Sequence, residues 1–117
     1  MKTSIIALAI VACTANAAHA QAPAARQGDA TTHGGLVLTG APTVIIGGRA
    51  AARAQDTASC PVVPPPPTPP HGLGFIATGS STVFIGGQPA ARIGDVIAEN
   101  GATSTIAAGA PTVLIGN

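Results

Sequence analysis

Short runs of β-branched and other apolar residues alternate with turn-forming segments along most of the chain. The runs occupy residues 36–38, 43–46, 75–77, 82–85, 105–107 and 112–115. Segments rich in glycine, such as Gly40-Ala41-Pro42 on one side and Gly47-Gly48 on the other, bound each run. After the first twenty residues no segment keeps a helical period of apolar positions. The pattern predicts an all-β domain of short β-hairpins with glycine turns.

A short unit recurs three times within this pattern. The copies read Pro23-Ala24-Ala25-Arg26-Gln27-Gly28-Asp29, Ala50-Ala51-Ala52-Arg53-Ala54-Gln55-Asp56 and Pro89-Ala90-Ala91-Arg92-Ile93-Gly94-Asp95. Each copy later closes with a Gly-x-x-Thr-Val segment that runs into Ile-Gly. One such unit is too small to bury a face alone, so we expect the three to pack about a pseudo-threefold axis. The predicted domain spans 21–117, with repeats at roughly 23–48, 50–87 and 89–117.

The first twenty residues have a different character. Met1-Lys2-Thr3 is weakly positive, Ile5 to Ala12 is apolar, and Ala18-His19-Ala20 has the small-x-small form of a signal-peptidase site. Residues 1–20 are therefore predicted to be a signal peptide or leader that is cleaved after Ala20. Three alternatives stay open: acylation of Cys13, which lies in a lipoprotein-like box, an uncleaved segment, and a start codon assigned at the wrong position.

Composition limits what the domain can be. The chain has 117 residues, room for one core, yet aromatic residues make up 2% and Trp and Tyr are absent. A chain so poor in large apolar side chains usually needs a metal, a disulfide or a partner to stabilise it. Charged residues are 8% and the formal net charge is +1. These values argue against a nucleic-acid surface and against a polybasic membrane patch.

Side chains able to bind a metal ion occur at the same distance in sequence from each repeated aspartate. Four positions after the aspartates lie His33, Cys60 and Glu99. His71, followed by glycine as His33 is, fills the histidine position of the second copy. Two imidazoles, a thiolate and a carboxylate suit tetrahedral zinc, and four ligands leave no open position, so we expect a structural site.

Two members of this set have other interpretations. If the leader is removed, Cys60 is the only cysteine and cannot form an internal disulfide, so it is an inert buried thiol, a reactive thiol or a metal ligand. Glu99 is either the fourth ligand or a solvated loop carboxylate. In the second case water or a partner group would take the fourth position.

A proline-dominated insertion, Pro61 to Pro70, separates Cys60 from His71. Such a run favours extended polyproline II and is typical of ligands for aromatic-lined grooves. We favour the simpler interpretation that it is a stiff loop which carries the chain from one ligand to the next.

The motifs Pro23-Ala24-Ala25-Arg26 and Pro89-Ala90-Ala91-Arg92, the repeated Gly-x-x-Thr-Val-x-Ile-Gly closures, His33-Gly34-Gly35 and Cys60-Pro61 resemble the PAAR-repeat proteins, which are the tips of type VI secretion spikes. The resemblance covers the chain from about Pro23 to Gly116. It implies a pointed cone of three β-hairpin repeats with zinc near the apex. The flat base of the cone would sit on a trimeric β-helical, VgrG-like spike.

Residue by residue, the resemblance implies that His33, Cys60 and His71 are the zinc ligands. The chain departs from the family in the third copy, where Glu99 and Asn100 stand in place of the usual histidine or cysteine. It departs again in the second copy, where Ala50 replaces the motif proline.

The motif arginines precede the aspartates by three residues and allow two interpretations. They either contact the spike at the base or pair with the aspartate inside each turn, and the regular spacing favours the internal pair. The arginines in question are Arg26, Arg53 and Arg92.

The resemblance implies a structural role: a monomeric tip on a homotrimeric spike, secreted from the cytoplasm, that assists membrane puncture and the delivery of effectors. No catalytic triad or phosphate loop is present in the sequence, so we expect no enzyme activity. The chain ends at Asn117, and we expect no appended toxin domain. The alternative is an exported periplasmic or secreted metal-binding module, which the leader favours.

Overall fold

A computed structural model describes residues 21–116, and the strands among them pair only antiparallel. The prediction of an all-β fold is confirmed at this level: the described residues form small antiparallel sheets. The predicted leader, residues 1–20, lies outside the described residues, so its cleavage and acylation stay predictions. Within the described part of the chain, no helix is long and apolar enough to cross a membrane.

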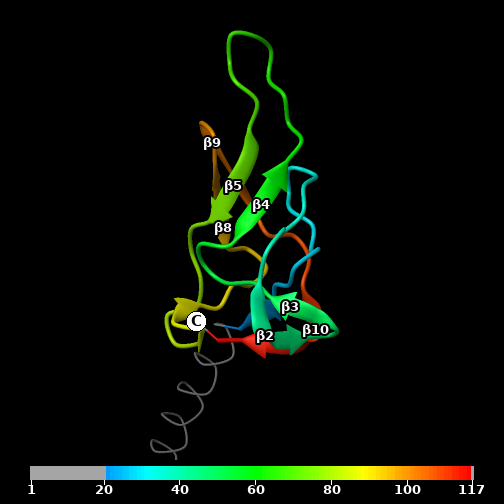
Figure 1. Cartoon of the computed structure of the whole chain (residues 1–117), viewed down its shortest axis with the longest axis vertical. Helices are drawn as coiled ribbons and strands as arrows, with labels where there is room; N and C mark the ends of the chain where they lie inside the picture. The colour runs from blue at the N-terminus through cyan, green and yellow to red at the C-terminus, as the bar shows by residue number, and fades with distance from the viewer. Residues whose placement is uncertain (1–20, 117) are drawn as a thin grey trace, which may run out of the picture.

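Three two-stranded sheets form from the segments around the repeated motif. They pair β1 (Ala22–Ala24) with β10 (Ala110–Ile115), β2 (Ala41–Ile46) with β3 (Arg49–Ala51), and β6 (Phe84–Ile85) with β7 (Gln88–Pro89). The Gly47-Gly48 turn joins β2 to β3 with φ of 57° and 81°. This left-handed conformation favours glycine, which explains why a Gly-Gly pair occurs at this turn. Figure 1 shows β2, β3 and β10 together at one end of the molecule.

A four-stranded sheet extends away from that end. Its order is β4 (Thr57–Cys60), β5 (Gly72–Ile76), β8 (Val96–Glu99) and β9 (Ala102–Thr105). The loop between β4 and β5 projects to the opposite end of the molecule (Figure 1). Within it the Thr68 N–H donates to the Pro65 carbonyl at 3.2 Å, so a turn interrupts the expected polyproline II run. Because β4 and β5 are antiparallel neighbours, the loop has to reverse direction.

The alanine immediately before each motif arginine takes part in a closed ring of backbone hydrogen bonds. Ala25 donates to Ala91 at 2.9 Å, Ala91 donates to Ala52 at 3.0 Å, and Ala52 donates to Ala25 at 2.9 Å. All three residues are 0–1% exposed. Alanine fits here because its small side chain lets three backbones approach one another. The ring joins segments that are far apart in sequence into one unit.

The core is divided at the level of this ring into two small clusters. One contains the ring alanines together with Ile76 and Ile97 of the four-stranded sheet and with Val37 and Ile106, which form isolated bridges beside it. The other contains the residues that precede the ring alanines, Ala24, Ala51 and Ala90, together with Ile85 and Ile115. The scarcity of large core side chains, expected from composition, is visible in both clusters.

Strand boundaries differ from those expected. Residues 36–38 contribute only isolated bridges at Leu36 and Val37, and the run at 105–107 overlaps β9 by one residue. Strands β1, β3 and β7 fall within or beside the motif connectors, and β4 and β8 directly follow the motif aspartates. Apart from Val96-Ile97 in β8 and Thr57 in β4, these segments hold mostly alanine, proline and polar residues of low β propensity. Pairing with neighbours fixes them as strands, not their own composition.

Candidate metal centre

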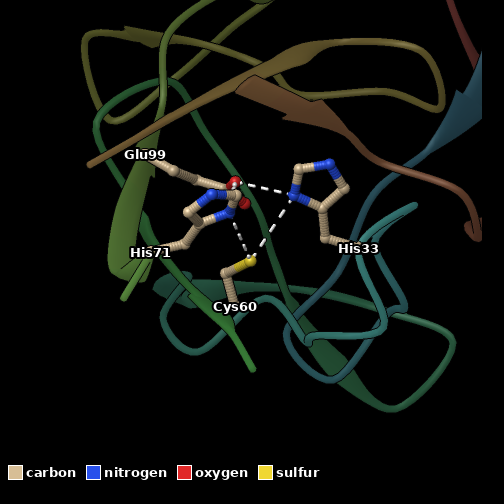
Figure 2. Close-up of side chains that lie close together, drawn as sticks. All are labelled: His33, Cys60, His71 and Glu99. Atoms are coloured by element: carbon tan, nitrogen blue, oxygen red, sulfur yellow. Dashed lines mark hydrogen bonds and ion pairs between the residues drawn. The ribbon is translucent and has the colours of Figure 1, made fainter. Parts of the chain in front are cut away.

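Four side chains predicted as ligands converge on one point. One ligand atom from each of His33, Cys60, His71 and Glu99 lies within 4.8 Å of the other three (Figure 2). Cys60 is the last residue of β4, His71 immediately precedes β5, and Glu99 is the last residue of β8. His33 lies in the turn that follows the first motif aspartate. All three motif copies therefore contribute to a single cluster that is able to hold a metal ion.

The spacing of these atoms is close to that of a tetrahedral shell. Bonds of ~2.0–2.3 Å at tetrahedral angles separate the ligand atoms by about 3.3–3.6 Å. Cys60 Sγ lies 3.5 Å from Nδ1 of His33 and 3.4 Å from Nδ1 of His71. Glu99 Oε1 lies 3.4 Å from Nδ1 of His71 and 2.8 Å from Nδ1 of His33. Of these four distances, only the last would have to lengthen around an ion at the centre.

Glycine brings the His33 turn close to the rest of the cluster. Gly34 adopts φ of 81°, which favours glycine, and its N–H donates to the Thr31 carbonyl at 3.1 Å. At Gly35, a Cβ atom would lie only 1.8 Å from the carbonyl oxygen of Ser59 in β4. No other residue fits there, so the His33-Gly34-Gly35 segment is fixed by its approach to the strand that ends at Cys60.

Glu99 is a buried carboxylate whose side chain is 1% exposed. Burial by itself would raise its pKa, but hydrogen bonds outweigh this effect and the pKa is lowered. The Ser104 hydroxyl donates to Oε2 at 2.6 Å, and His33 and Cys60 contact the same carboxylate. Glu99 is therefore ionised at neutral pH and is not the solvated loop carboxylate of the alternative interpretation.

Burial, followed by the negative charge of Glu99, raises the pKa of the Cys60 thiol, although a backbone hydrogen bond from Val62 acts in the opposite direction. The residue is 5% exposed. Without a cation the sulfur therefore holds its proton at neutral pH, and a bound metal would have to displace that proton. A buried thiol with a raised pKa is a poor nucleophile, so the reactive-thiol interpretation loses support.

The charges around the cluster fit a cation. Three other carboxylates of the described residues are buried, and each forms an ion pair with an arginine. Among the described residues Glu99 forms ion pairs only with His33 and His71, with no Lys or Arg. A buried carboxylate, a thiol and two imidazoles with no strong cation nearby are the donor set that a divalent ion of borderline softness prefers.

The motif arginines form the internal pairs that their spacing favoured. Each guanidinium grips its aspartate with two nitrogens, as in Arg26, whose Nε and Nη2 lie 3.1 Å from Oδ2 and Oδ1 of Asp29. The same two contacts join Arg53 to Asp56 and Arg92 to Asp95. The backbone N–H of each arginine also donates to its aspartate. These pairs close the motif turns away from the metal cluster.

Two residues of this network were not singled out in the sequence. Ser104 holds the second oxygen of Glu99, and Arg49 reaches Asp29 from the neighbouring hairpin. The Asn100-Gly101 pair was an available signal for the first, since Asn-Gly is a strong marker of a two-residue hairpin turn. That turn joins β8 to β9 and brings Ser104 beside Glu99. Nothing local in the sequence marks Arg49.

The PAAR motif family matches the chain over residues 27–103, which is more than half of its length. The chain therefore belongs to the PAAR motif family, as its motifs indicated. No curated protein matches its sequence. Proteins with the PAAR motif are structural spike tips, not enzymes, and membership implies delivery by the type VI secretion system and binding to a VgrG spike.

Proposed function

We propose that this chain is a structural tip protein that caps and sharpens a trimeric type VI secretion spike, and that His33, Cys60, His71 and Glu99 hold a structural zinc ion in it. The tip assists membrane puncture and the delivery of effectors. The observation that carries the proposal is the meeting of ligands from all three motif copies at one point. A metal there would crosslink the three copies at their least supported end.

The proposed shape is a pseudo-threefold cone built by residues 21–117. The closed ring of Ala25, Ala52 and Ala91 supports such an axis, because each residue makes the same contact with the next copy. The three motif aspartates behave in the same way toward Val37, Ile76 and Ile106. One polypeptide with three unequal repeats is able to match a threefold partner at one end and to narrow to a single ion at the other.

The proposed base carries three exposed apolar side chains at equivalent repeat positions. Ile45, Phe84 and Leu114 each occupy the third position of a Thr-Val-x-Ile segment and are 59%, 58% and 53% exposed. Two of them lie on β2 and β10, at the end opposite the projecting loop (Figure 1). Such a set suits the end of a homotrimeric β-helix, with apolar contacts and pairing of exposed strand edges.

Arg26, Arg53 and Arg92 serve this base from within in our proposal. Their guanidinium groups are held by aspartate, and Nη1 of Arg92 also donates to the Gly116 carbonyl at 3.2 Å, at the end of β10. They thereby fix the positions of the hairpins instead of presenting free charge to the spike.

Binding to the spike is tested with the purified chain and a purified trimeric VgrG-like spike. The expected complex contains one copy of the chain per trimer, measured by light scattering after size exclusion. Failure of the chain to bind any cognate spike, together with recovery of a periplasmic form, would favour the alternative metal-binding module. N-terminal sequencing of the native protein after cell fractionation distinguishes the two, because only the exported form loses residues 1–20.

Zinc is tested by metal analysis of the purified wild type and of two variants. His71→Ala removes a proposed ligand and should lose most of the metal. Val63→Ala is the matched control, since Val63 lies in the loop that leads to His71 but its side chain is 71% exposed. It should keep one zinc per chain. Equal zinc content in His71→Ala and the wild type would refute the ligand assignment.

A further inference from the structure

Ser104 and Glu99 are linked in a way that the motif pattern does not require. In the antiparallel pair of β8 and β9, Ile97 faces Ser104 and Glu99 faces Ala102. Ser104 and Glu99 are therefore diagonal neighbours on one face of the sheet, within reach of a long side chain. The Ser104 hydroxyl donates to Oε2 of Glu99 at 2.6 Å, the distance of a strong hydrogen bond to a carboxylate.

The two carboxylate oxygens of Glu99 have different surroundings. Oε2 accepts the hydrogen bond from Ser104, while Oε1 faces Nδ1 of His33 and Nδ1 of His71 at 2.8 and 3.4 Å. Ser104 is itself 4% exposed, so water does not compete freely for its hydroxyl. One oxygen is thus directed at the ligand cluster and the other is held away from it.

The other motif copies supply an internal comparison. The N–H groups of Val37, Ile76 and Ile106 donate to the aspartates of their own copies, which makes these residues equivalent. Two positions before each of them stand Gly35, Gly74 and Ser104. A Cβ at the glycines would lie 1.8 Å from Ser59 O and 2.4 Å from Ala98 O. A side chain occurs only in the copy that contributes a carboxylate to the cluster.

We propose that Ser104 is a positioning residue that makes Glu99 a one-oxygen ligand of the metal, through Oε1. The inference rests on the proposed metal centre. A carboxylate free to rotate is able to bind an ion with both oxygens, which adds a fifth contact and disturbs a tetrahedral shell. With Oε2 bonded to Ser104, Glu99 replaces the single donor atom of a histidine or cysteine. Hydrogen bonds of this kind to ligands typically change metal affinity about 10–100-fold.

The test compares zinc affinity, measured by chelator competition, in the wild type, Ser104→Ala and Ser104→Thr. Ser104→Ala should bind zinc about 10–100-fold more weakly, and Ser104→Thr, which keeps the hydroxyl, should stay near the wild type. Thr103→Ala is the control for strand integrity, because Thr103 is exposed on the opposite face of β9. It should leave zinc affinity unchanged.

Two further measurements separate positioning from general loss of stability. In the cobalt-substituted protein, Ser104→Ala should weaken the intense visible bands of four-coordinate cobalt, because the released carboxylate adds a fifth contact. In a Glu99→Ala background, Ser104→Ala should have no additional effect on affinity. Equal affinities and spectra for Ser104→Ala and the wild type would overturn this inference alone. A wild-type chain that binds no metal would overturn the metal centre as well.

Discussion

Arg49 donates a hydrogen bond from Nη2 to Oδ1 of Asp29 at 3.0 Å, a contact made only in the first motif copy. In the other copies the aspartate accepts a threonine hydroxyl, from Thr39 to Asp56 and from Thr78 to Asp95, both at 2.9 Å. Backbone hydrogen bonds identify the residue that corresponds to these threonines beside Asp29. The N–H groups of Leu38 and Ala77, which precede Thr39 and Thr78, donate to Thr57 and Val96, and the equivalent bond beside Asp29 runs from Ala107 to Ala30.

The residue after Ala107 is Ala108, which has no hydroxyl to donate. Arg49 therefore supplies to Asp29 the donor that threonine supplies elsewhere. We expect Arg49→Ala to lower the free energy of unfolding by about 0.5–1 kcal/mol, since Arg49 is 42% exposed and water screens its charge. The melting temperature should fall by about 2–8 °C. Ala108→Thr should recover much of that loss in the Arg49→Ala background, and should add little to the wild type. Equal melting temperatures for Arg49→Ala and the wild type would contradict this account.

The alanine ring should tolerate almost no increase in size. Ala52 is 1% exposed and lies where three backbones meet, so Ala52→Val forces the copies apart. The expected loss of stability is about 1–3 kcal/mol. Ala77→Val is a suitable control, because Ala77 is exposed and follows β5. Denaturant unfolding of both variants measures the difference. If the two variants unfold at the same concentration, the ring is not the tightly packed point that the hydrogen bonds indicate.

The sequence predicted those parts of the site that follow from the repeated motif and its spacing. The offset of four residues from the motif aspartate selected His33, Cys60 and Glu99, and the structure brings these three side chains into one cluster. The proline-rich loop conceals the place of His71, yet β4 and β5 pair in a register that sets Cys60 opposite Gly72. His71 thus returns to the side of Cys60, as its histidine-glycine position predicted.

The remainder depends on contacts between strands that no local pattern encodes. Ser104 reaches Glu99 only through the register of β8 and β9, and Arg49 reaches Asp29 from the hairpin of β2 and β3. The motif strands were missed for a related reason: alanine and proline have low β propensity, and their pairing comes from the neighbouring copies.

Metal binding should depend on pH through Cys60 and not through Glu99. The raised pKa of the thiol means that it is protonated at neutral pH in the metal-free chain, whereas the lowered pKa of Glu99 means that the carboxylate is already ionised. Zinc binding near pH 7 should therefore release about one proton from the thiol, and affinity should rise up to about tenfold per pH unit below the thiol pKa. Titration calorimetry in buffers of different ionisation enthalpy counts the protons. Release of no proton at pH 7 would show that the thiol is not a ligand or that it is already ionised in the metal-free chain.

The apolar triad of Ile45, Phe84 and Leu114 should govern binding to the spike and leave the metal centre unaffected. Phe84 is 58% exposed on β6, so Phe84→Asp places a charge on the proposed base without creating a cavity in the core. Desolvating that charge against an apolar partner should weaken spike binding by about 2 kcal/mol or more. Zinc content and melting temperature should stay near wild-type values, because β6 belongs to a different sheet from Cys60 and Glu99 and the Phe84 side chain is mostly exposed. The control is Leu73→Asp, since Leu73 is 67% exposed but lies on β5, in the sheet that leads to the metal cluster.

Binding measured by biolayer interferometry on an immobilised spike should be lost in Phe84→Asp and kept in Leu73→Asp. The reverse order would place the spike-binding surface on the four-stranded sheet and would require the tip to be seated the other way round.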